Sequence, residues 1–156
     1  MKKLQHLWFA FLVIILLAGC DEHGDPQGEI ELNEKQKASV SMRGKWGQAS
    51  DALLPFGTTP GILDDLIIEF RIDDDYNPSK FSAVGAPYFF LGENGTWAWS
   101  DETLTLISLD NILPVTSINI MEEGNAIRLS FTYDGPSGGR ISKVGDYGIT
   151  LRKIAP

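Results

Sequence analysis

Residues 66–73 read Leu-Ile-Ile-Glu-Phe-Arg-Ile-Asp, and this alternation of apolar and charged side chains decides the class of the fold. Successive side chains of an extended chain point to opposite faces. Leu66, Ile68, Phe70 and Ile72 therefore fall on one face, and the charged residues between them fall on the other. The stretch predicts a half-buried β-strand.

The same pattern returns along the chain from residue 44 onward. Further alternating stretches lie at Trp97–Trp99, Leu104–Leu106, Ile118–Ile120, Ile127–Tyr133 and Tyr147–Leu151. Turn signals rich in Gly, Asn, Asp and Pro separate them, and no convincing amphipathic helix falls in this region. Many short strands divided by turns predict an all-β domain over residues 44–156. We expect a small antiparallel up-and-down β-barrel, with a β-sandwich as the alternative.

The N-terminus has the layout of a secretory signal. Lys2 and Lys3 precede an apolar run over residues 7–17, which is shorter than the ~20 residues that span a bilayer. The run ends in Leu-Ala-Gly-Cys at Cys20, which resembles the lipobox of bacterial lipoproteins. That resemblance implies a signal peptide over residues 1–19, cleavage before Cys20, and acylation of Cys20. Labelling with palmitate would detect this acylation. The alternative is an ordinary anchor or signal with a chance cysteine.

Residues 20–43 are expected to be the lipidated N-terminus and a flexible tether. Glu29–Lys37 could form a short helix, but its charge and its lack of an apolar stripe favour a solvated tether. Acidic residues directly after Cys20 resemble inner-membrane retention signals of enteric bacteria and surface-export signals of Bacteroidetes-type bacteria, and a plain spacer is the alternative. We expect a protein anchored in the cell envelope through its lipid, at the outer membrane or cell surface rather than the inner membrane.

Composition excludes several kinds of chemistry. The net charge is −8, which argues against nucleic acid as a partner. The chain has two histidines, His6 and His23, and one cysteine, Cys20, all outside the predicted barrel. The barrel therefore has no Ser-His-Asp or Cys-His arrangement and no zinc site of the usual kind. We expect no enzymatic activity, no cofactor and no metal.

One acidic turn has part of the spacing of a calcium loop. Asp73, Asp75 and Asn77 have the first three ligand spacings, but Pro78 stands where Gly is required and Val84 where the bidentate Glu belongs. A solvated acidic turn is therefore the favoured interpretation.

The start and end of the predicted domain carry a second resemblance. Gly44-Lys45-Trp46 resembles the Gly-x-Trp motif that opens the barrel in the calycin superfamily, the lipocalins and avidin-like proteins. The resemblance implies that Trp46 closes one end of the barrel and that a basic residue of the last strand, here Arg152, packs over its ring. Together with the lipobox, the domain looks like small lipocalin-like envelope lipoproteins of Bacteroidetes.

An aromatic concentration marks the candidate ligand site. Tyr88, Phe90, Trp97 and Trp99 would share one face if their segments paired as a hairpin around residues 92–95. They could line a cavity for a small apolar ligand, form a platform for sugars, or simply fill the core. The expected function is non-enzymatic binding of a small apolar ligand or of an envelope partner. The alternative is a surface carbohydrate-binding module, and exposure of the two tryptophans separates these possibilities.

Overall fold

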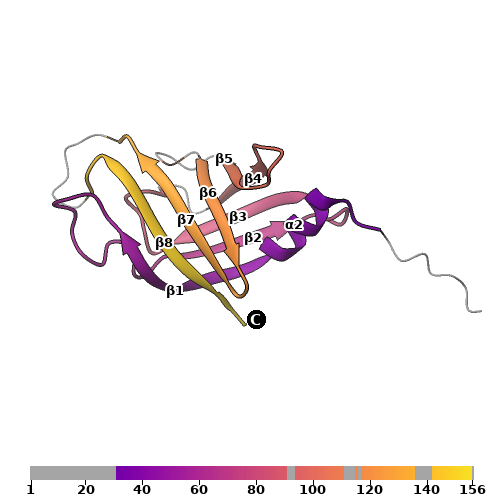
Figure 1. The fold of residues 1–156 in the computed structure, drawn as a ribbon, viewed down its shortest axis with the longest axis horizontal. Helices are drawn as coiled ribbons and strands as arrows, with labels where there is room; N and C mark the ends of the chain where they lie inside the picture. Colours follow the sequence, from indigo (N-terminus) through magenta and orange to yellow (C-terminus); the bar gives the residue numbers. More distant parts are fainter. Residues whose placement is uncertain (1–30, 91–93, 111–114, 116, 136–141, 156) are drawn as a thin grey trace, which may run out of the picture. The chain divides into compact units, whose positions relative to one another are not determined.

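The computed structural model describes residues 31–90, 94–110, 115, 117–135 and 142–155. The leader and the acylation site at Cys20 lie outside the described residues. Within the described residues the chain forms one helix and eight strands, and Figure 1 shows their arrangement. In chain order these are α2 (Glu34–Met42), β1 (Gly44–Leu53), β2 (Ile67–Ile72), β3 (Pro78–Val84), β4 (Asn94–Trp99), β5 (Leu106–Asp110), β6 (Ser117–Glu123), β7 (Ala126–Tyr133) and β8 (Gly145–Ile154).

The eight strands form a closed antiparallel barrel in which each strand pairs with its neighbours in sequence. Closure comes from β1, which pairs with β2 through Trp46 and Ile68 and with β8 through Trp46 and Lys153. A sandwich would leave strand edges unpaired, so this closure excludes that alternative. The protein is an up-and-down barrel, as the alternation predicted, and this is the architecture of the lipocalins.

Because the strands alternate in direction, their connections fall at two ends of the barrel. We call the end that holds the connections after β1, β3, β5 and β7 the loop end. The opposite end holds the turns after β2, β4 and β6 together with α2, and we call it the helix end. Figure 1 shows α2 beside the ends of β2 and β3.

Helix α2 begins at a capping box. The side chain of Asn33 accepts a hydrogen bond from the backbone N–H of Gln36, and the Gln36 side chain accepts one from Asn33, both at 2.9 Å. The Gln36 amide also donates to the carbonyl of Asp75 in the β2–β3 turn at 2.8 Å. Ser39 and Met42 are buried. The prediction of a tether as far as residue 43 is therefore wrong for residues 34–42, because this helix packs across the helix end.

Two irregularities interrupt β1. Gln48 and Asp51 have positive φ angles of 55° and 51°, and the register with β8 shifts beside each of them. The Arg128 guanidinium on β7 donates to the carbonyl of Asp51 and to the Thr150 hydroxyl. A Cβ on Gly148 would come within 2.7 Å of that guanidinium, so the glycine gives Arg128 its path across β8.

The barrel interior is filled with apolar side chains. The largest fully buried ones include Trp46, Phe70, Phe81, Phe89 and Tyr147. Two local predictions differ from the structure. Leu104 lies in the β4–β5 turn with a positive φ instead of in a strand, and residues 88–90 do not form the hairpin partner of β4, which is β3.

Candidate functional site

Trp46 closes the helix end of the barrel by capping α2. Its ring is buried, and its Nε1 donates to the carbonyl of Met42 at 2.8 Å. The Lys153 ammonium lies 5.0 Å from the centre of the Trp46 ring and donates to the carbonyl of Ser41 at 3.0 Å. Carbonyls in the last turn of a helix lack partners within the helix. The indole and the ammonium therefore satisfy two of them and fix α2 to the barrel.

The residue over the Trp46 ring is thus Lys153, and the assignment of Arg152 to this contact is wrong. The inward side of β8 carries Tyr147, Ile149 and Leu151, so the next inward position is 153. Arg152 falls on the outer face, paired with Gly47 and Ala126 and exposed to solvent. A shift of one residue reverses the face of a side chain in a strand.

Trp97 and Trp99 are buried in the part of the barrel interior that lies near the helix end. They are 3% and 9% exposed, and their rings meet edge to face at 5.5 Å and 72°. Trp97 Nε1 donates to the carbonyl of Arg71 at 2.8 Å, and Trp99 Nε1 donates to the Ser39 hydroxyl at 3.0 Å. Two buried, roughly perpendicular rings with satisfied N–H groups do not form a flat platform, which counts against a sugar-stacking role for them.

Phe90 belongs to a second ring cluster, formed around Phe89. The Phe89 ring lies within 5.4 Å of the rings of Phe131, Tyr133 and Tyr147. Phe90 is buried and lies 5.9 Å from Phe131. The Tyr147 hydroxyl donates to the carbonyl of Lys143 and accepts from its N–H, so this cluster is tied to the β7–β8 connection.

The four predicted ligand residues are therefore not brought onto one face. Trp97 and Trp99 lie in one ring cluster, Phe90 lies in the other, and Tyr88 is 42% exposed at the loop end. Among the described residues, the inward rings contact each other and fill the space between the strands. This packing agrees with the third possibility raised by the sequence, that the aromatic residues simply fill the core.

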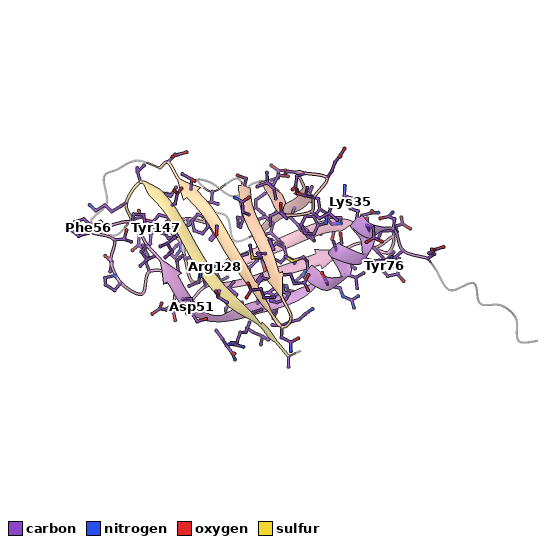
Figure 2. The ribbon with its side chains drawn as sticks, viewed as in Figure 1. Lys35, Asp51, Phe56, Tyr76, Arg128 and Tyr147 are labelled. Carbon is purple, nitrogen blue, oxygen red and sulfur yellow. The ribbon has the colours of Figure 1, made fainter. Side chains whose placement is uncertain are left out.

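The loop end carries an unusual number of exposed apolar side chains. Of the seven large ones exposed in the described part of the chain, six lie there, and Met121 on β6 is the exception. Figure 2 shows Phe56 at the end opposite to Lys35 and Tyr76. We call these six residues the apolar rim: Leu53, Phe56, Ile67, Val84, Tyr88 and Val144.

The apolar rim has acidic surroundings. Asp64 and Asp65 lie in the β1–β2 connection, and Asp134 and Asp146 flank the β7–β8 connection. Within the described part of the loop-end connections, Lys143 is the one basic residue. The sequence signal for the rim was Pro55-Phe56-Gly57, an aromatic inside a turn where no strand face could bury it. Our sequence interpretation missed it.

Among the residues that the structure describes, two carboxylates have shifted pKa values, and each shift has a structural cause. The pKa of Asp101 is lowered to about 2, first because the Thr103 hydroxyl donates to the carboxylate and further because Leu106 and Thr105 do. The pKa of Glu69 is lowered, chiefly by a hydrogen bond from Arg71. Both groups stay ionised near neutral pH, so neither is placed to act as a general acid.

The acidic turn after β2 is held by backbone hydrogen bonds to one of its own carboxylates, that of Asp73. Asp73 Oδ1 accepts hydrogen bonds from the N–H groups of Asp75 at 3.0 Å and Asn77 at 2.8 Å. This is an Asx-type turn, as expected for an acidic connection.

Over the residues that the structure describes, no group of three or more His, Cys, Asp or Glu side chains could hold a metal ion. The same residues include no helix that is long and apolar enough to cross a membrane.

Fold and contacts together define an eight-stranded up-and-down barrel with a filled interior, an end closed by a helix and an apolar rim at the other end. Comparison of the chain with protein-family models, with curated proteins and with solved structures gave no match.

Proposed function

We propose that this chain is a lipid-anchored cell-envelope lipoprotein whose non-enzymatic, lipocalin-like barrel binds an envelope protein partner through its loop end. The anchor rests on the lipobox at Cys20 and the apolar leader before it. The binding role rests on the apolar rim, which is the single observation that carries the proposal. Apolar side chains gathered at one end of a domain mark interaction sites more often than scattered ones do.

The filled interior favours a partner over a small apolar ligand inside the barrel. Phe89 occupies the loop-end part of the interior and contacts the rings of Phe131, Tyr133 and Tyr147. A lipocalin-type ligand would have to displace these rings, at a cost comparable to opening a core cavity. Binding at the surface has no such cost.

The chemistry of the apolar rim indicates what kind of partner fits it. Phe56 is fully exposed, and Leu53 and Val144 are 57% and 49% exposed. A Cβ on Gly145 would lie 3.1 Å from the Pro55 ring, so the connection after β1 passes close to the start of β8. Aspartates surround this patch. A partner surface with an apolar recess bordered by Lys and Arg would complement it.

A photo-crosslinking amino acid at position 56, introduced into the anchored protein in living cells, tests the proposal. We expect a discrete adduct with one envelope protein, because an exposed aromatic at a rim acts as an anchor for binding. The matched control is the same substitution at Met121, an apolar side chain that is also exposed, at 60%, but lies elsewhere on the barrel. That position should give no adduct.

Two further variants examine the chemistry of the contact. Phe56→Ser should reduce binding to the identified partner at least tenfold while leaving the melting temperature unchanged, because surface changes cost less than about 0.5 kcal/mol. Asp64→Asn combined with Asp65→Asn should weaken binding mostly at low salt. Equal adducts at positions 56 and 121, or adducts with lipid alone, would contradict the proposal.

A further inference from the structure

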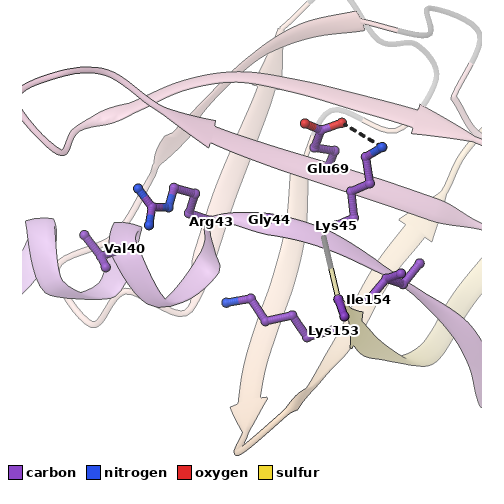
Figure 3. A pocket seen from close by; sticks show the side chains of 8 residues that line it. Val40, Arg43, Gly44, Lys45, Glu69, Lys153 and Ile154 are labelled. Carbon is purple, nitrogen blue, oxygen red and sulfur yellow. Dashed lines mark ion pairs between the residues drawn. The ribbon is translucent and has the colours of Figure 1, made fainter.

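An open pocket lies on the outer face of the barrel at the helix end, on the side away from the apolar rim. Its volume is about 630 Å³, within the range of sites for small molecules. Figure 3 shows its walls, with Val40 and Arg43 from the end of α2, Lys45 from β1, Glu69 from β2, and Ile154 from β8. The Lys153 side chain completes it.

The pocket is basic in a protein that is acidic. Arg43, Lys45 and Lys153 line it with a single acid, Glu69, whereas the chain as a whole carries a net charge of −8. Gathered cations with apolar walls concentrate positive potential in a concave site. The charge pattern therefore selects an anion here, although the rest of the surface repels one.

The three cations differ in how strongly protein groups already hold them. The Arg43 guanidinium has no hydrogen-bond or ion-pair partner among the described residues. Lys45 Nζ forms a long ion pair with Glu69 Oε2 at 3.9 Å, beyond hydrogen-bond distance, while Arg71 Nε bonds to the other oxygen, Oε1, at 2.9 Å. Lys153 is occupied with Ser41 and Trp46, so it contributes its charge and its apolar stem.

The end of α2 would repel an anion if its last carbonyls were open, because a helix C-terminus carries partial negative charge. Here Ser39 accepts from the Arg43 N–H, Ser41 accepts from Lys153, and Met42 accepts from Trp46. These contacts satisfy the last carbonyls of the helix that borders the pocket, so the repulsion of an anion by the helix end is reduced.

We propose that this pocket binds an amphiphilic anion, a phosphate or carboxylate group on a short hydrocarbon chain. The anionic head meets Arg43 and Lys45, and the hydrocarbon part lies on Val40 and Ile154. A guanidinium binds such oxyanions through its paired N–H groups, and an ammonium binds them as a point charge. The source of the anion is a free single-chain metabolite or a phospholipid headgroup.

Isothermal titration of the full chain in a neutral detergent, at low ionic strength, tests this site. Hexyl phosphate should bind at least tenfold more tightly than inorganic phosphate, which lacks the hydrocarbon chain, and than hexanol, which lacks the anionic group. Dihexanoylphosphatidylglycerol is the second probe. If only hexyl phosphate binds, the natural ligand is a free single-chain anion. If the lipid binds more tightly, the ligand is a phospholipid headgroup. Either result supports an anion site in this pocket.

Variants connect the binding to these residues. Arg43→Gln with Lys45→Gln should weaken binding of the better probe about tenfold through the loss of two charge contacts. Glu69→Gln should instead tighten it by about threefold, since a nearby negative charge is removed. The matched control is Lys35→Gln with Lys80→Gln, two exposed lysines outside the pocket, which should stay within twofold of the parent protein.

Three results would overturn the proposal. The first is no binding of either amphiphile. The second is equal affinity of the double pocket variant and the lysine control, with both variants showing the parent's melting temperature. The third is inorganic phosphate binding as tightly as hexyl phosphate, which would remove the apolar half of the site.

Discussion

Replacing Lys153 with methionine removes the charge over Trp46 and keeps an apolar stem of similar length. The ammonium lies 5.0 Å from the ring centre and 3.0 Å from the Ser41 carbonyl. A partly exposed cation–π contact contributes about 0.5–1 kcal/mol. A cation at a helix C-terminus contributes about 0.3–1 kcal/mol more. We therefore expect Lys153→Met to lower the free energy of unfolding by about 1–2 kcal/mol.

Arg152→Met is the matched control, because it removes a positive charge one residue away on the same strand. Arg152 is exposed on the outer face, so we expect a loss below about 0.5 kcal/mol. Urea denaturation followed by circular dichroism measures both variants, and an unchanged m-value shows that the two share a denatured state. In a thermal melt, the Lys153 variant should lose roughly 4–8 °C.

Variants of Trp46 test the same contact from the side of the aromatic ring. Trp46→Ala removes a buried ring and leaves the Met42 carbonyl without its donor, so we expect a loss of about 3–5 kcal/mol. Trp46→Phe combined with Lys153→Met should show a coupling of about 0.5–1 kcal/mol in a double-mutant cycle. The reasoning fails if Arg152→Met costs as much as Lys153→Met, or if Trp46→Ala costs less than about 1 kcal/mol.

Two other predictions concern the anchor and the β4–β5 turn. Cys20→Ala should abolish labelling with radioactive palmitate and leave the protein unprocessed or unanchored, whereas undiminished labelling would place the acyl group elsewhere. The pKa of Asp101 is lowered in the fold to about 2 from its ordinary 3.8, so its ionised form stabilises the fold above about pH 4, and this contribution is lost as the pH falls toward 2. The melting-temperature difference between the parent and Asp101→Asn should therefore shrink over that interval, and a constant difference between pH 2 and pH 7 would contradict the assignment.

Local patterns in the sequence predicted several of the strands, but not β3 (Pro78–Val84). The alternation at residues 66–73 and 127–133 appears as β2 and β7, because burying one face of a strand needs no information from distant residues. Leu104 shows the limit of this reasoning. Its spacing from Leu106 fits a strand, but Asp101 accepts hydrogen bonds from Thr105 and Leu106 and holds the chain in a turn.

Helix α2 was missed for a related reason. Its apolar stripe is weak, because only Ser39 and Met42 are buried, and the pattern of residues 29–37 indicated a solvated segment. The Asn33-x-x-Gln36 capping box was a visible start signal. The contacts that hold the helix in place come from Trp46, just after the helix, and from Trp99 and Lys153, which lie far along the chain.

The sequence by itself determined the all-β class, the turn positions, the acidic charge and the absence of histidine and cysteine from the barrel, since these depend on composition and short-range spacing. Only the tertiary structure decided that the sheet closes between β1 and β8, that Lys153 instead of Arg152 covers Trp46, and that Phe56 projects from the loop end. These outcomes depend on strand register and on contacts between distant residues. A shift of one residue turns each side chain of a strand to the other face, so neither composition nor local spacing specifies them.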